Sequence, residues 1–210
     1  MRFLLAIAVL ASAWTAGAQG TSEAILGYNN NSAVGLFTNT AGWTFQTAGA
    51  ITVTELGCLT NFLFHNGSSS QIQVGLWTPG GSLLASNLIT SSSVLSNQSR
   101  YEPITPVVLS PGQDYHIGAF LPSGSFSLDA ALPFFGGSVS NSTAIVLLGT
   151  AQGSGSFFSS PIAEPGTAGG AYLGPNFLYR NVPEPSSWLL LGLGGCLLAA
   201  RRRHRRLPNL

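Results

Sequence analysis

The stretch Gln71–Thr90, QIQVGLWTPGGSLLASNLIT, indicates how this chain folds. Its first half alternates the apolar residues Ile72, Val74 and Leu76 with glutamine and glycine, which is the period-two pattern of a half-buried β-strand. The turn residues Pro79-Gly80-Gly81 interrupt this pattern, and a second apolar run then leads back. The stretch therefore predicts two antiparallel strands joined by a tight turn.

Similar segments recur on both sides of this stretch. Strands are expected at Trp43–Gln46, Ile51–Phe62, Gln71–Thr78, Ser82–Thr90, Tyr101–Leu109, Tyr115–Leu121, Phe126–Leu128, Ala144–Leu148 and Ala171–Tyr179. Short strands separated by glycine and proline turns are typical of antiparallel sandwiches and jelly rolls. No helical pattern is seen outside the two ends of the chain. The predicted fold class is therefore all-β, an antiparallel β-sandwich or jelly roll over residues 19–181.

The middle region is nearly free of charge. Charged residues make up 7% of the chain, against about 25% in typical globular domains. Lysine is absent, and residues 19–181 hold two arginines and six acids, which gives a formal charge of −4. Such a region lacks the basic surface that nucleic-acid binding requires, so no nucleic-acid partner is expected.

Cysteine is rare. Cys196 lies in an apolar run near the C-terminus, which leaves Cys58 alone in the middle region. A disulfide within that region and a cysteine-based metal cluster are both excluded. Cys58 stands in an apolar, strand-like segment, so we expect a buried and unreactive thiol.

The first 18 residues have the features of a signal peptide. Arg2 supplies a positive start, and Phe3–Ala13 is an apolar core of the usual length. Ala16 and Ala18 form a small-x-small cleavage site, so we expect signal peptidase to cut after Ala18. The secretion translocon and signal peptidase are therefore expected partners, and the middle region is expected to be exported.

The last part of the chain has the features of a short membrane anchor. Trp188–Ala200 contains no charged residue and would reach about 20 Å as a helix, less than the bilayer core of about 30 Å. We expect a short transmembrane helix over residues 186–200. The basic cluster that follows acts as a stop-transfer signal and stays in the cytoplasm; it consists of Arg201, Arg202, Arg203, Arg205 and Arg206.

Ahead of this anchor stand Val182, Pro183, Glu184 and Pro185. The two prolines favour an extended backbone of the kind that proteases bind. This motif, the apolar run and the arginine cluster together resemble the PEP-CTERM sorting signal of exported bacterial proteins, over residues 182–206. The resemblance implies processing by an exosortase near the motif. It also implies a precursor held for a time in the inner membrane of a Gram-negative bacterium.

The same resemblance implies a final place at the cell surface, in the outer membrane or in an exopolysaccharide matrix. A second resemblance covers residues 42–121, through ITVTELG, VGLWTPGGSLLAS and PVVLSPGQDYHIGAF. These segments are similar to a domain of unknown function found in secreted bacterial proteins, which implies a β-sandwich and no particular activity. The expected function is that of a non-enzymatic surface or matrix protein.

Candidate catalytic residues are few. Asp114 and His116 lie on one side of a strand, where a carboxylate can orient an imidazole, but a turn-capping aspartate beside a half-exposed histidine is the favoured interpretation. Glu55 and Glu102 are a candidate glycosidase pair if their strands are neighbours. No hydrolase motif accompanies these residues, and His65 has the sequence context of a loop edge. A secreted hydrolase stays an alternative, and no cofactor is expected.

Carbohydrate binding is the other alternative, because aromatic rings stack on sugars. The candidate rings are those of Trp43, Trp77, Tyr101, Tyr115 and Tyr172. Trp77 ends its strand on the polar-facing phase and is expected at the surface with Tyr115 as a partner, whereas Trp43 is expected in the core. A calcium site from Asp114 and Asp129 is also considered, but the acids are scattered and no metal site is predicted.

Overall fold

The computed structural model describes residues 20–29, 32–37, 39–59, 71–120, 126–131, 138–153, 158–163 and 171–182. The predicted signal peptide, the PEP residues 183–185, the predicted transmembrane helix and the arginine cluster lie outside these ranges. Within them every strand pairing is antiparallel and no helix is present, which confirms the predicted all-β class. Accordingly, none of the described residues belongs to a helix long and apolar enough to cross a membrane.

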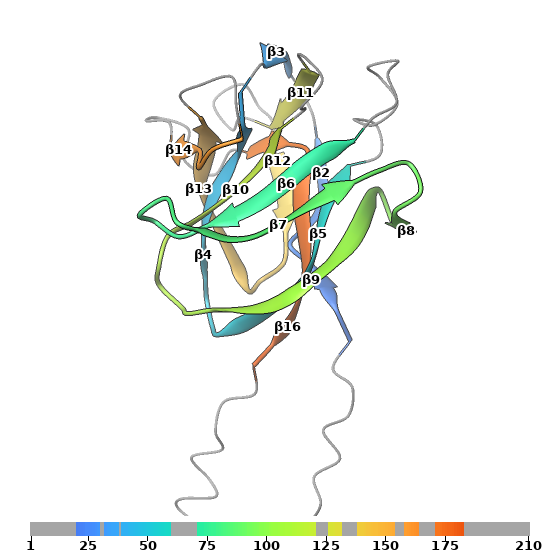
Figure 1. Cartoon of the computed structure of the whole chain (residues 1–210). Helices are drawn as coiled ribbons and strands as arrows, with labels where there is room; N and C mark the ends of the chain where they lie inside the picture. The colour runs from blue at the N-terminus through green and yellow to red at the C-terminus, as the bar shows by residue number, and fades with distance from the viewer. Residues whose placement is uncertain are drawn as a thin grey trace, which may run out of the picture.

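Two larger sheets form most of the body (Figure 1). The first, called the β16 sheet, has the order β1 (Ser22–Glu23), β16 (Pro175–Asn181), β5 (Ile51–Leu59), β9 (Ser99–Leu109) and β8 (Val94–Ser96). The second, called the β10 sheet, has the order β14 (Ile162–Ala163), β13 (Ile145–Gln152), β4 (Ala41–Thr47), β10 (Tyr115–Phe120), β6 (Ile72–Trp77) and β7 (Leu83–Ile89).

Two smaller sheets accompany them. One has the order β15 (Ala171–Leu173), β11 (Phe126–Ala131) and β3 (Ser32–Phe37), and the other pairs β12 (Ser138–Asn141) with β2 (Ile25–Asn29). Strands β3 and β11 lie at the upper end of the molecule in Figure 1, and β16 ends at the lower end.

Aromatic side chains join the two larger sheets in one core. Trp43 and Phe45 of β4 contact Phe177 of β16, with ring centroids 5.8 Å and 5.1 Å from that of Phe177. The Trp43 Nε1–H donates to the carbonyl oxygen of Pro175, at 2.9 Å. All three rings are fully buried, which confirms the predicted core position of Trp43. Burying one such apolar side chain contributes about 1.5–3 kcal/mol, so this contact between sheets is a major source of stability.

Most long strands stand where the sequence predicts them, and six short ones do not appear in the prediction. The unpredicted strands are β1, β2, β3, β8, β12 and β14. They are two to six residues long. Strand β13 extends to Gln152, beyond the predicted end at Leu148, because a register shift between Leu147 and Gly149 lets the pairing with β4 continue.

The first and last described strands are fastened to each other. The Asn176 carboxamide oxygen accepts the Ile25 N–H at 3.0 Å, and its nitrogen donates to the Ile25 carbonyl at 3.1 Å. The same nitrogen donates to the Tyr101 hydroxyl at 2.9 Å. The Ala24 N–H donates to the Phe177 carbonyl at 3.0 Å. Asn176 is buried, so this one side chain ties the N-terminal strands to both β16 and β9.

We expect Asn176→Ala to lower the free energy of unfolding by roughly 2–4 kcal/mol, because it leaves the buried amide and carbonyl of Ile25 without partners. Urea denaturation measures the loss. Asn181→Ala, at the exposed end of the same strand, is the matched control and should change stability by about 0.5 kcal/mol or less. Equal unfolding midpoints for the two variants would contradict this role of Asn176.

Candidate functional site

A row of three glycines crosses the centre of the β10 sheet. Gly118 of β10 is the register partner of Gly42 in β4 and of Gly75 in β6. Their neighbours Trp43 and Ile117 point into the core, and side chains alternate along a strand, so the glycines face outward. These positions carry no side chain over the outer face of the sheet, and we call the row the glycine trough.

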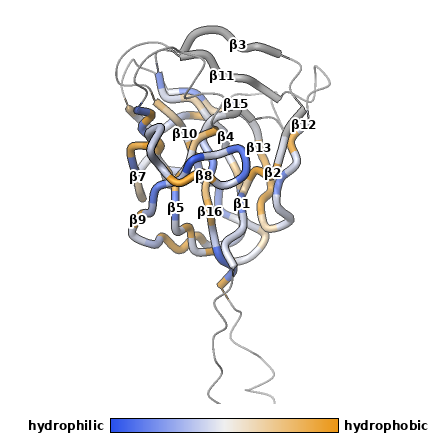
Figure 2. Tube along the Cα trace, turned by 90° about the vertical axis from the view of Figure 1, so that its right-hand side faces the viewer, coloured by the Kyte–Doolittle hydropathy of each residue, from blue (hydrophilic) through white to orange (hydrophobic). Residues whose placement is uncertain are grey.

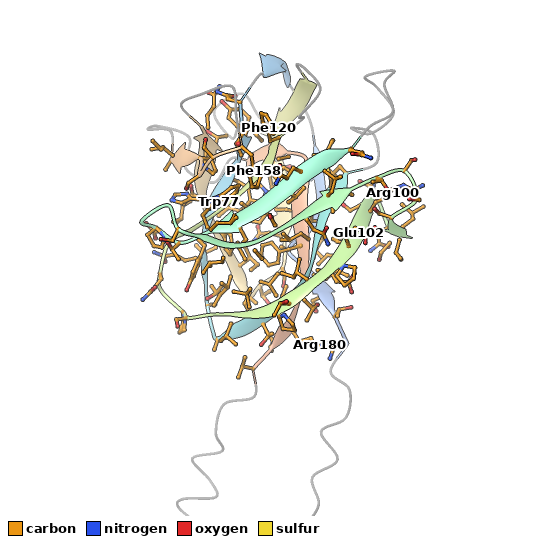
Figure 3. All side chains as sticks on the ribbon, viewed as in Figure 1. Trp77, Arg100, Glu102, Phe120, Phe158 and Arg180 are labelled. Atoms are coloured by element: carbon orange, nitrogen blue, oxygen red, sulfur yellow. The ribbon has the colours of Figure 1, made fainter. Side chains whose placement is uncertain are left out.

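Trp77 lies over this trough. A methyl group added to Gly75 would overlap the rings of Trp77 and Phe158. The ring centroids of Trp77 and Phe158 are 5.0 Å apart, and Figure 3 shows the two side chains beside each other. Trp77 is only 3% exposed. The sequence placed Trp77 on the correct side of its strand, but the predicted exposure is wrong because residues 158–161 cover the ring.

Residues 158–161, called the strap, are tied to Thr40. The Ser159 N–H donates to the Thr40 hydroxyl at 3.0 Å, and the Thr40 carbonyl accepts the Gly153 N–H at 2.7 Å. A Cβ on Gly118 would lie 2.6 Å from Thr40 Cγ2 and 3.2 Å from Pro161 Cγ. The strap therefore fills the trough that the glycines leave open.

None of the five rings considered for sugar stacking is exposed; they are Trp43, Trp77, Tyr101, Tyr115 and Tyr172. Tyr115 lies on the core face of β10, with its ring centroid 5.8 Å from that of Phe45. Its hydroxyl accepts the Ser110 N–H at 3.0 Å. Trp77 and Tyr115 therefore lie on opposite faces of the sheet and form no common platform.

Asp114 and His116 each bind another residue. His116 Nδ1 shares a hydrogen bond of 3.0 Å with the Thr44 hydroxyl, and Asp114 Oδ1 accepts from the Gln46 amide at 2.7 Å. His116 is 9% exposed, so the half-exposed position expected from the sequence is wrong. Burial lowers the pKa of His116, and the negative charge of Asp114 partly opposes that shift. This arrangement holds the imidazole in place without joining it to the carboxylate.

The other candidate sites are not assembled either. Glu55 pairs with Pro103, and Leu56 pairs with Glu102. Consecutive pairs point to opposite faces, so the two carboxylates lie on opposite sides of the β16 sheet. Over the ranges that the structure covers, no three acidic, histidine or cysteine side chains gather as a metal site would need. His65 and the Asp129 side chain lie outside what the structure describes, and Cys58 is fully buried, as predicted.

A groove that the sequence analysis missed runs between β7 and the Pro103–Val107 segment of β9. Its volume is about 350 Å³ and no charged residue lines it. The Asn87 amide spans it by donating to the Pro103 carbonyl at 2.9 Å. The groove exists because β9 leaves its register with β5 between Pro103 and Val107. Pro103 and Pro106 inside a strand were the sequence signal for this irregularity.

The C-terminal end of β16 is the last described feature. Asn181 pairs with Ile51, and the Val182 N–H donates to the Ala50 carbonyl at 2.9 Å. The backbone of the body is therefore ordered up to the first residue of the predicted sorting motif.

Two family profiles match the chain. One, described as a domain of unknown function (DUF4082), matches residues 30–169, which are 140 of the 210 residues. The chain belongs to the DUF4082 family. The DUF4082 match begins after β2 and ends before β15, so it leaves out the terminal strands β1 and β16. No curated protein matches the chain.

The second profile, described as a PEP-CTERM protein-sorting motif, matches residues 181–206 of this DUF4082 protein. Both resemblances expected from the sequence are thereby confirmed. The sorting motif implies an exported protein that an exosortase processes from a membrane-anchored precursor. The match starts at the last residue of β16, so body and sorting motif follow each other directly.

His116 should make the protein less stable in mild acid. Burial lowers its pKa in the folded state below the unfolded value of about 6.5, so the unfolded chain binds more protons between these two values. The free energy of unfolding should therefore fall as the pH drops through about 6.5. His116→Gln, whose amide can still bond Thr44, should flatten that decline in urea titrations between about pH 7 and 5.

His65→Gln is the matched control for this pH dependence, because the sequence places His65 at a loop edge. This control should keep the decline of the parent protein. If His116→Gln and the parent protein lose stability in parallel over the same range, a cause other than His116 is responsible.

Gly75→Ala should displace the strap. The added methyl overlaps the Trp77 and Phe158 rings, and overpacking of this kind costs about 1–3 kcal/mol. We expect a lower unfolding midpoint and a red shift of tryptophan emission, because the Trp77 ring becomes wetter. Gly49→Ala, where an added Cβ meets no atom within 4 Å, should change neither. Parent-like emission and stability of Gly75→Ala would show that the strap does not pack on Trp77.

Proposed function

We propose that this DUF4082 protein is an exported, non-enzymatic β-sandwich protein of the surface or exopolysaccharide matrix of a Gram-negative bacterium. An exosortase delivers it there through the C-terminal sorting motif. The observation that carries the proposal is the match over residues 181–206, which contains the motif, the apolar run and the arginine cluster in that order.

Export follows from the charge arrangement at both ends. The signal peptide enters the translocon, and signal peptidase releases the N-terminus after Ala18. Transfer then halts at the C-terminal arginines, because each arginine placed at the centre of a membrane helix costs about 2.5–3.5 kcal/mol. The short apolar run, which contains Gly192, Gly194 and Gly195, holds the precursor in the bilayer until the exosortase acts.

A non-enzymatic role is supported by the engagement of the candidate catalytic groups. His116 and Asp114 are committed to Thr44 and Gln46, and Glu55 and Glu102 point to opposite faces. The body has a formal charge of −4 and no lysine, so its polar groups are mainly hydroxyls and amides. Such a composition suits a protein that lies within a hydrated polysaccharide matrix.

Replacing Pro183, Glu184 and Pro185 together with alanine should leave a form that retains its tail in the membrane. The change removes the fixed φ angles and the single charge that mark the motif. Intact-protein mass spectrometry of the protein from its native host should then find residues up to Leu210 on the membrane-associated variant, and a shortened chain in the parent protein.

The matched control carries Pro111→Ala and Glu102→Ala, which make similar changes within the body. This control should be processed as the parent protein is. The proposal fails if the triple variant is shortened at the same position as the parent protein, so that the two mature masses differ by no more than the substitutions account for.

A further inference from the structure

The two terminal strands of the body begin and end at the same place. Ser22 pairs with Tyr179 and Glu23 with Leu178, in antiparallel register. Strand β1 therefore starts beside the residues at which β16 ends. Figure 2 shows the two strands next to each other, and β16 runs to the end of the body opposite β3 and β11 (Figure 1). The start of β1 and the end of β16 therefore lie on the same side of the body.

We call this side the base and define it by three segments, Ala48–Ala50, Ser110–Gln113 and Arg180–Val182. Backbone hydrogen bonds connect them. The Val182 N–H donates to the Ala50 carbonyl at 2.9 Å, and the Gly112 N–H donates to the Thr47 carbonyl, just before the first segment, at 3.1 Å. The base is therefore a continuous surface of the folded body.

The chain between the base and the expected membrane helix is very short. Val182 belongs to the body through its bond to Ala50, and the predicted helix begins at Ser186, four residues later. Four extended residues span at most about 14 Å. The headgroup layer takes up about 5–8 Å of that length on each side of a bilayer. The remaining gap of about 6–9 Å is narrower than an α-helix, which is about 10 Å across with its side chains.

No folded element of another protein fits into such a gap beneath the body. The base must therefore meet the lipid headgroups, and an exosortase must reach the motif from the side. The composition of the base agrees with this. Its only charged residue is Arg180, which is exposed. In the part of the chain that the structure covers, no carboxylate forms an ion pair with Arg180, so its guanidinium is available to anionic lipid headgroups.

We propose that the base rests on the headgroup surface of the membrane in the tethered precursor. The inference rests on the proposed function, because it needs the C-terminal tail in the bilayer. The contact fixes the orientation of the body. Strands β3 and β11 point away from the membrane, and β1 begins on the membrane side of the body, beside the end of β16.

The test uses the tethered precursor, residues 19–210, in vesicles of phosphatidylethanolamine and phosphatidylglycerol. An environment-sensitive fluorophore is attached to Ala48→Cys in the base or to Val94→Cys in β8, both with Cys196→Ala. Val94 is 69% exposed and pairs with Tyr101, eight residues along β9 from Leu109, or about 26 Å from the base. Cys58 is fully buried and its pKa is raised by that burial, so it does not compete for the label.

A lipid with a quencher on its headgroup then reports proximity. We expect a loss of emission at Ala48 and unchanged emission at Val94. Gln113→Cys, in another exposed segment of the base, should repeat the Ala48 result. The body without the tail, residues 19–182, provides the baseline and should lose the quenching at Ala48.

Flotation of the vesicles distinguishes a failure of the base contact from a failure of the tail anchor. Precursor that floats with the vesicles but shows equal emission at Ala48 and Val94 overturns the base contact and leaves the tail anchor intact. Precursor that does not float overturns the proposed anchor and the base contact with it. Quenching at Ala48 that appears only after exosortase is added to the vesicles shows that the enzyme, and not the short tether, brings the base to the lipid, and it overturns the contact proposed for the tethered precursor.

Discussion

The attachment of the N-terminal strands β1 and β2 to the last strand, β16, is the contact on which the rest of the structure depends. Asn176 binds both backbone groups of Ile25 and the hydroxyl of Tyr101, and it does so from the strand that carries Phe177 into the core. The N-terminal strands are thus held by the C-terminal strand, and the body is complete only when nearly the whole exported region has been translocated. The same pairing brings both ends to one side, which makes a short tether to a membrane geometrically simple.

A second feature, the glycine trough with its strap, determines what the surface can do. Gly75 and Gly118 leave room on the outer face of the β10 sheet, and Trp77, Phe158 and Pro161 occupy it. The sheet thereby buries apolar residues on both faces, which adds stability that a nearly charge-free chain cannot draw from ion pairs. Trp43 and Trp77 are both buried by packing, so they are not available to bind a ligand. Interactions of the body with other molecules must therefore use other surfaces, such as the base.

The sequence predicted what depends on local pattern. Alternation located the long strands, the lone Cys58 indicated a buried thiol, and the order of motif, apolar run and arginines identified the sorting signal. It failed where a distant segment decides the outcome. The side of the strand to which Trp77 points was predicted correctly, but the burial of its ring depends on residues some eighty positions later in the chain. Glu55 and Glu102 lie on opposite faces because of the register between β5 and β9, which no single-strand pattern contains. Interior glycines in β4, β6 and β10 were the available hint of a close neighbour.

The central claim is that the folded body closes at Val182, flush with the sorting motif. Amide hydrogen exchange of the protein tests it most directly. The Val182 amide, bonded to Ala50, should be protected as strongly as the Ala24 amide, which is bonded to Phe177, because both belong to the same unit of structure. Exchange at Val182 as fast as at exposed Gln113, with Ala24 still protected, would place the end of the body earlier in β16 and contradict the account.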